Sequence, residues 1–115
     1  MKVLRKVSAG EWLEVEPRGE GDFVLYEVEP ARRFILRRIA IHFPRNTGGE
    51  LICHFKRGIE KIFPRYGELA GDGTTFRDEM NLELISGEQI KLHYYNRSLS
   101  EVKKCFCFIE GDLLE

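Results

Sequence analysis

Alternation of apolar and polar residues over short segments is the main pattern along the chain. Residues 51–56, 80–84 and 90–95 each place apolar side chains at every second position. A period of two predicts strands with one buried face. Glycine-containing turns separate these segments at short intervals, and this spacing favours an all-β fold. Further strands are expected at about residues 11–16, 23–28, 33–43, 59–63 and 102–109.

Residues 33–43 form the longest expected strand, and the apolar pattern changes phase partway along it. Phe34 and Leu36 occupy even-numbered positions, whereas the large apolar residues after Arg38 occupy odd-numbered positions. One extra residue at Arg37–Arg38 brings both groups onto one face, which is the effect of a β-bulge. We therefore predict a bulge or sharp bend at this dipeptide. The apolar set consists of Phe34, Leu36, Ile39, Ile41 and Phe43.

Three other segments carry local predictions. Residues 84–90 join two alternating segments through Ser86-Gly87, which predicts a hairpin. Residues 102–109 have apolar side chains at both odd and even positions, so both faces of this strand are apolar. We therefore expect the strand to be central in a sheet or covered by another part of the protein. One helical turn around residues 76–80 is the only helical alternative along the chain.

The length of 115 residues is suited to one domain, and 43% apolar residues supply its core. We predict an antiparallel, jelly-roll-like β-sandwich of about eight strands. An N-terminal arm is expected over about residues 1–10, and a short C-terminal tail over about residues 111–115. The aliphatic Leu113 and Leu114 of this tail are candidate contacts with a second subunit, and packing on their own domain is the alternative.

The charge balance names no partner class. Eighteen basic and nineteen acidic residues give a net charge of -1, without the basic footprint of a nucleic-acid-binding protein. No apolar segment approaches the roughly 18 residues of a membrane span, and the first residues lack the apolar stretch of a cleaved signal peptide. We expect no nucleic-acid and no membrane partner. One Gln and three Asn beside 32% charged residues indicate a heat-adapted source.

The reactive residue types form no catalytic or metal-binding motif. The cysteines are odd in number without C-x-x-C spacing, which indicates buried, reduced thiols. The histidines lack the spacing of metal ligands, and phosphate-binding glycine loops do not occur in the sequence. We therefore predict no enzymatic activity, no cofactor and no metal. The residues in question are Cys53, Cys105, Cys107, His42, His54 and His93.

Residues 67–79 form the longest irregular segment and are rich in acidic side chains. Their order does not match the calcium-binding pattern D-x-[DN]-x-[DN]-G. Long loops of compact domains often contact partners, and the alternative is a solvated loop closed by the Asp72-Gly73 turn. The candidate interaction residues are Glu68, Asp72, Phe76 and Arg77 of this segment, with Leu113 and Leu114 of the tail.

Four stretches of the sequence carry a family resemblance. They are GDFVLYEVEPARRFILRRIAIHF, GGELICHFKRGIEKIFPRYGELAGDGTTF, LISGEQIKLHYYNRS and the closing FIEGDLLE. From about residue 20 to residue 115, the chain resembles small all-β structural proteins of tailed phages and related virus-like particles, of the decoration or auxiliary type. The resemblance implies a jelly-roll-like sandwich that self-associates, often around a three-fold axis, and binds other virion subunits without catalysis. It implies a location in the virion or the cytoplasm.

Two functions from different classes remain open. The first is a non-enzymatic structural module that forms a symmetric homo-oligomer, with a trimer favoured, through apolar contacts and a rim of Arg/Glu pairs. The second is a sandwich that binds carbohydrate or another small polar ligand through exposed aromatic side chains. The candidates for that role are Trp12, Tyr66, Tyr94 and Tyr95.

Overall fold

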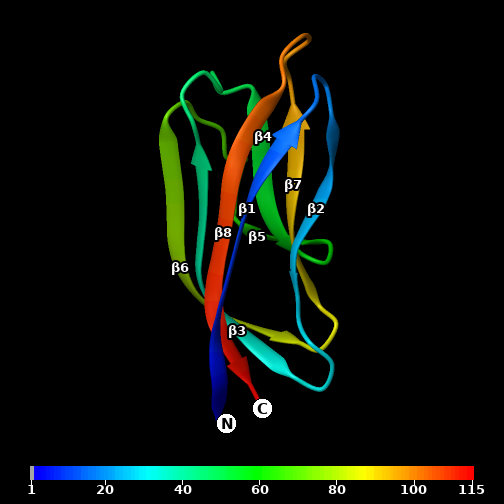
Figure 1. The fold of residues 1–115 in the computed structure, drawn as a ribbon, viewed down its shortest axis with the longest axis vertical. Coiled ribbons are helices and arrows are strands. Elements are labelled where there is room, and N and C mark those ends of the chain that lie inside the picture. The colour runs from blue at the N-terminus through cyan, green and yellow to red at the C-terminus, as the bar shows by residue number, and fades with distance from the viewer. Residues whose placement is uncertain (1) are drawn as a thin grey trace.

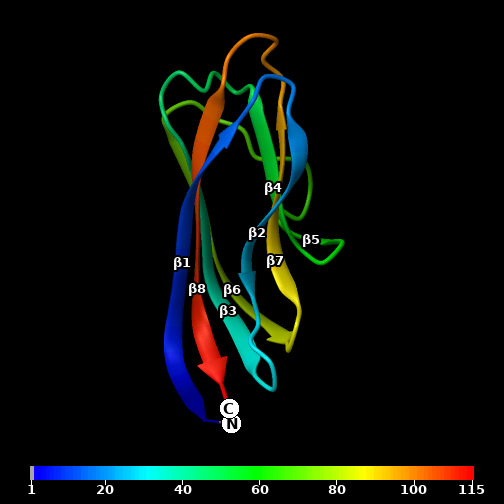
Figure 2. The ribbon, with the colours of Figure 1, turned by 45° about the vertical axis from the view of Figure 1, so that its right-hand side comes forward.

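Eight antiparallel strands form two four-stranded sheets, which lie face to face in Figure 2. The computed structural model describes residues 2–115. Sheet A has the strand order β1-β8-β3-β6, and sheet B has the order β2-β7-β4-β5. The sandwich measures 48 × 24 × 21 Å, and both chain ends lie at one end of its long axis (Figure 1). The strands are β1 (Val3–Val15), β2 (Glu20–Glu27), β3 (Arg33–Phe43), β4 (Leu51–Arg57), β5 (Glu60–Phe63), β6 (Thr74–Ile85), β7 (Gln89–Asn96) and β8 (Lys103–Leu114).

Strand pairing is nested from the two chain ends toward the middle. β1 pairs with β8, β2 with β7, β3 with β6 and β4 with β5, all in antiparallel orientation. The chain is thus one long antiparallel ribbon folded over into two sheets, which is the winding of a jelly roll. The predicted fold class, an all-β antiparallel sandwich of about eight strands, is confirmed.

The core lies between the sheets because alternate side chains of every strand point inward. Phe34 and Ile41 of sheet A and Phe55 and Leu92 of sheet B are completely buried. Strand β8 lies between β1 and β3 in sheet A, so the prediction that residues 102–109 form a central strand is confirmed.

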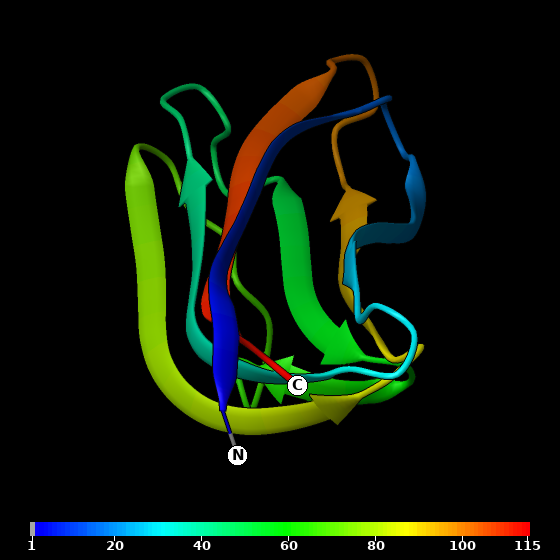
Figure 3. The ribbon, with the colours of Figure 1, turned by 60° about the horizontal axis from the view of Figure 1, so that its bottom comes forward.

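Strand β3 contains the predicted bulge. Its pairing with β8 passes from Leu36 opposite Gly111 to Arg38 opposite Glu110, so Arg37 is the extra residue. The register against β6 shifts at the same place, and β6 follows a strongly curved path around the end of the sandwich (Figure 3). Because of the extra residue, the apolar side chains on both sides of the bulge reach the core. All five of them, Phe34, Leu36, Ile39, Ile41 and Phe43, have no exposed surface.

The predicted hairpin at residues 84–90 is wrong in its pairing. A tight turn is present, since the Glu88 N–H donates to the Ile85 carbonyl at 3.0 Å. The strands that it joins lie in different sheets, because β6 pairs with β3 whereas β7 pairs with β2 and β4. A glycine turn satisfies the local backbone whether the next strand stays in the sheet or crosses to the other one.

The two chain ends are strands, which corrects the expected arm and tail. β1 begins at Val3 and β8 ends at Leu114, and these two residues are register partners. The first residues of β1 are exposed on both faces, so no apolar alternation marks this strand in the sequence. Of the arm predicted over residues 1–10, Met1 lies outside the described residues. In the tail predicted over residues 111–115, all but the last residue belong to β8.

The helical turn expected around residues 76–80 is also wrong, since strand β6 covers this segment. The irregular segment predicted over residues 67–79 is shorter for the same reason and gives way to strand at Thr74. Residues 2–115 contain no helix with the length and apolar composition required to cross a membrane.

Candidate functional site

Aromatic side chains lie on the solvent-facing side of sheet A. Trp12 of β1 is the register partner of Phe106 in β8, which pairs in turn with His42 in β3, and His42 pairs with Thr75 in β6. These residues form one row across the sheet. The rings of Trp12 and Phe106 are 5.4 Å apart and tilted by 58°, and the Nζ of Lys104 lies 5.2 Å from the Trp12 ring centroid. Trp12 is 53% exposed, so its ring is available to a partner.

A second row runs beside the first through Gly10, Phe108, Ala40 and Arg77. The small residues on both sides of Phe108 keep the surface low around its ring. A Cβ atom on Gly10 would lie only 2.7 Å from the Cζ of Phe106, so glycine allows that ring to lie across β1. We define the aromatic face as Trp12, Phe106 and Phe108 with the small residues Gly10 and Ala40.

Strand order explains why these rings face solvent. Cys105 and Cys107 of β8 are buried in the core. Because side chains alternate along a strand, Phe106 and Phe108 point to the opposite side of the sheet. No other element of residues 2–115 is stacked on this side, and both rings therefore remain partly exposed.

A depression lies over β3 at the edge of the aromatic face. One wall is formed by the rings of Phe106 and Phe108, and the other by polar side chains of β3 and β6. The polar wall includes His42, whose Nδ1 lies 2.7 Å from the Thr75 hydroxyl oxygen, and the guanidinium of Arg77. The depression can therefore contact an apolar group on one side and hydrogen-bond a polar group on the other.

Two charged residues of opposite sign border the aromatic face. Glu14 of β1 and the exposed Arg77 of β6 lie on opposite sides of it. Among residues 2–115, neither makes an ion pair or a side-chain hydrogen bond. Their charges are therefore available to a partner at the two borders.

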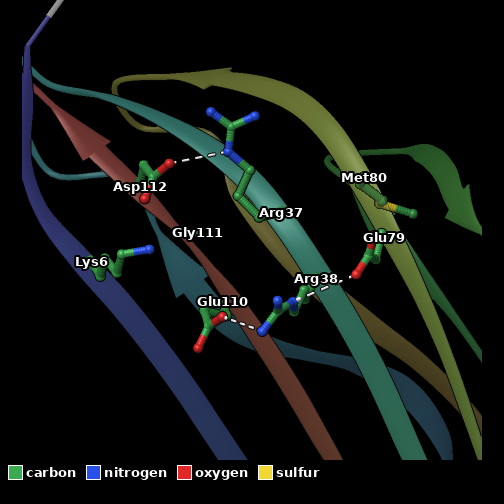
Figure 4. A pocket seen from close by; sticks show the side chains of 8 residues that line it. All are labelled: Lys6, Arg37, Arg38, Glu79, Met80, Glu110, Gly111 and Asp112. Carbon is green, nitrogen blue, oxygen red and sulfur yellow. Dashed lines mark hydrogen bonds and ion pairs between the residues drawn. The ribbon is translucent and has the colours of Figure 1, made fainter.

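The half of sheet A nearer the chain ends has a different surface, shown in Figure 4. The Arg37 side chain donates to Asp112 at 3.1 Å and to Asn81 at 2.6 Å. Arg38 donates to Glu110 at 3.2 Å. We call these five residues the ion-paired face. Their charges are matched within the chain, so this half has little to offer a charged ligand.

Three of the predicted interaction residues pack inside the domain. Leu113 and Leu114 are 1% and 5% exposed, so both are buried within their own domain, which was the alternative considered; of the two, Leu113 belongs to the core cluster. Phe76 is half-buried, and its ring meets that of Phe43 edge-on at 6.1 Å. None of the three therefore forms an exposed contact surface.

The other three lie apart from one another. Arg77 borders the aromatic face. Asp72 accepts the Gly48 N–H at 3.1 Å within the loops at one end of the sandwich. Glu68 lies on the outer side of sheet B, where its carboxylate contacts His54. The structure thus places one of the six predicted residues, Arg77, at the candidate site.

All three cysteine thiols are buried, and the pKa is raised at two of them. A hydrogen bond with the Cys105 thiol, together with burial, raises the pKa of Cys53 far above its ordinary value. Burial raises the pKa of Cys107 to about 12. Protonated thiols are poor nucleophiles, which agrees with the interpretation of these residues as core side chains.

The aromatic residues first considered for ligand binding do not form a common platform. Tyr94 packs against the core, Tyr66 is 89% exposed in the loop after β5, and Trp12 lies on the other sheet. Of these residues, Trp12 belongs to the aromatic face, whose other two rings are Phe106 and Phe108. The sequence signal for these two rings is that residues 102–109 carry apolar side chains at both odd and even positions. Because side chains alternate along a strand, one of the two sets must face away from the core.

Comparison with known proteins gives a likeness of fold. No protein-family model and no curated protein matches the chain. A chain in the structure of infectious bursal disease virus, Gt strain, superposes with a TM-score of 0.51 at 11% identity, over 95% of this chain and 31% of that one. This chain thus corresponds to about a third of the viral one. The crystal structure of FlhE gives a TM-score of 0.48 at 11% identity, over 92% of this chain and 96% of that one.

Proposed function

We propose that this protein is a non-enzymatic structural module that forms a homo-oligomer through the aromatic face. The observation that carries the proposal is the cluster of Trp12, Phe106 and Phe108 on the solvent side of sheet A, with Trp12 53% exposed. Clustered aromatic side chains are the residues that dominate binding energy at protein interfaces. Burial against a second copy removes this apolar surface from water.

The borders of the aromatic face support a second copy of the chain as the partner. When two copies stack with a two-fold axis along the strands, the β1 border of one copy meets the β6 border of the other. Glu14 and Arg77 of different copies then lie along the same border of the interface, two rows apart along the strands. Opposite charges on one border attract over this distance and contribute mainly to orientation and specificity.

The setting of this assembly is the finer part of the proposal. The resemblance to decoration and auxiliary proteins of phages favours a virion component. It implies a trimer, whereas two-fold stacking of the aromatic faces gives a dimer, and the oligomer number measured below distinguishes the two. Other virion structural proteins are then the further partners, and the site of action is the virion or the cytoplasm in which it assembles. The buried, protonated thiols support a module that does no nucleophilic chemistry.

The oligomeric state of the full chain tests the proposal. Size-exclusion chromatography with light scattering is expected to show a dimer or trimer at micromolar concentration. Trp12→Glu is expected to weaken association about 30-fold or more, which corresponds to the loss of about 2 kcal/mol at an interface hot spot. Because Trp12 is exposed, its replacement should leave the melting temperature nearly unchanged.

Ile59→Glu is the matched control. Ile59 is 97% exposed in the turn between β4 and β5, so this variant adds the same charge at an exposed apolar position elsewhere. It is expected to associate as the unmodified protein does. A monomeric unmodified protein, or equal effects of the two substitutions, would contradict the proposal.

The depression beside the aromatic face favours a second candidate function, the binding of a carbohydrate or small polar ligand. A sugar ring can stack on Phe106 while its hydroxyl groups bond to His42, Thr75 and Arg77. A glycan array is the direct measurement. Hits that disappear in Arg77→Ala would favour this function, and an array without hits would exclude carbohydrate as the ligand.

A further inference from the structure

Two histidines that are far apart in the sequence face each other on the outer side of sheet B. His54 of β4 and His93 of β7 are direct register partners. Their rings stack with centroids 4.9 Å apart and planes 29° apart. Both side chains are partly open to solvent, at 17% and 26% exposure. A ligand from solution can therefore reach both imidazoles.

Each imidazole is held by a carboxylate at its Nδ1 atom. The Nδ1–H of His54 donates to Glu68 at 2.8 Å, and that of His93 donates to Asp22 at 2.8 Å. A carboxylate can only accept, so these bonds place the proton of the neutral ring on Nδ1 and leave the Nε2 lone pair free. Histidines that bind metal ions are oriented in this way.

Two lysine side chains help to hold the carboxylates of Asp22 and Glu68 in place. The Nζ of Lys56 lies 2.7 Å from Asp22, and the Nζ of Lys61 lies 3.6 Å from Glu68. Hydrogen bonds from Lys56 and His93 hold the pKa of Asp22 below its ordinary value.

A third carboxylate is within reach of the histidine pair. The Oε2 of Glu20 lies 3.5 Å from the Nε2 of His93, and the Glu20 side chain is 61% exposed. Exposed side chains rotate easily, so this carboxylate can move toward a cation. With Glu20 included, three carboxylates lie beside the two imidazoles, together with the ammonium groups of Lys56 and Lys61.

We propose that His54 and His93 bind a late divalent transition-metal ion, with Zn²⁺ as the representative, through their Nε2 atoms, with Glu20 and water completing the coordination. Imidazole nitrogen is a preferred ligand of this class of ion. In residues 2–115 as they lie, no three side chains of the ligand types converge on one point. Binding therefore requires the two rings and the Glu20 side chain to rotate.

Isothermal titration calorimetry of the untagged, full-length protein with zinc chloride at neutral pH tests the proposal. One Zn²⁺ per chain is expected. His54→Ala and His93→Ala should each abolish binding or weaken it at least tenfold. Glu68→Gln, which keeps the shape but loses the ionised partner of His54, should weaken binding by about 10- to 100-fold, the usual effect of removing an outer-shell partner.

The matched control is His42→Ala on sheet A, because His42 is the third histidine and has no neighbouring histidine. It is expected to bind Zn²⁺ as the unmodified protein does. Thermal melting checks that each variant is folded, and histidine proton NMR of the unmodified protein should show shifts at His54 and His93 alone. Absence of one-to-one binding by the unmodified protein would overturn the proposal. So would His54→Ala and His93→Ala variants that bind Zn²⁺ as tightly as the unmodified protein does.

Discussion

The two halves of the outer surface of sheet A lie on the same four strands and differ in how their side chains are matched. On the ion-paired face, Arg37 and Arg38 each meet a carboxylate of β8. On the aromatic face, exposed rings lie between Glu14 and Arg77, which have no partner within residues 2–115. The charges of the ion-paired face are matched within the chain, whereas the aromatic face leaves apolar rings and two charges in contact with solvent.

The bulge in β3 lies at the boundary between these halves. Its extra residue allows Arg37 and Arg38 both to reach the outer surface, where β8 supplies Asp112 and Glu110. Beyond the bulge, the outward positions of β3 are Ala40 and His42, and the facing positions of β8 are aromatic. A single inserted residue therefore separates a charged surface from an apolar one.

The largest expected effect comes from Gly111→Ala in the ion-paired half. A Cβ atom at this position would lie 2.3 Å from the Ile35 carbonyl oxygen and 2.4 Å from the Cζ of Phe34. The carbonyl belongs to the backbone and Phe34 is completely buried, so neither can move freely. We expect a loss of about 3 kcal/mol or more in the free energy of unfolding, measured by urea denaturation. A loss below about 1 kcal/mol would show that β3 and β8 separate more easily at the bulge than their close contact indicates.

Arg37→Ala should have a smaller effect. The substitution removes hydrogen bonds to Asp112 and Asn81, while the Arg37 side chain is 44% exposed. Exposed ion pairs contribute little, so we expect a loss of about 0.5–1 kcal/mol in the free energy of unfolding. The difference from the unmodified protein should shrink in about 1 M salt, where screening is strong. Association should be unchanged, and a large change would place the ion-paired face in the interface.

The smallest expected effect on stability comes from Gly10→Ala on the aromatic face. Its Cβ atom would approach the outer end of the Phe106 ring, which is partly exposed and can tilt away. We expect a change of about 0.5 kcal/mol or less in the free energy of unfolding, as for other surface substitutions. The displaced ring should nevertheless alter Trp12 fluorescence and weaken association. Unchanged association would indicate that the partner does not contact this part of the face.

Short-range alternation was sufficient to predict the sandwich and the bulge, because burial of one strand face imposes a period of two on any partner strand. It failed at residues 84–90, where a tight turn leads into the other sheet and not into a hairpin. It failed also at residues 3–10, which begin the edge strand β1, because residues 3–6 are exposed on both faces and only Val7 and Ala9 pack against the core.

The candidate sites were harder to predict, since each is assembled from separate strands. Trp12 and Phe106 are neighbours through β1-β8 pairing, and His54 and His93 through β4-β7 pairing. Spacing along the chain does not reveal such pairs. The second set of apolar positions in residues 102–109 was the one sequence signal for the aromatic face, whereas the histidine pair had none.

What the sequence alone determined is the class of fold, the bulge at Arg37–Arg38 and the burial of the cysteines, because these depend on the local alternation of side chains. Only the tertiary structure decided which strands became neighbours, and with them the aromatic face, the ion-paired face and the opposed histidines. The physical reason is that register and strand order depend on the packing of the whole core, which no short segment contains.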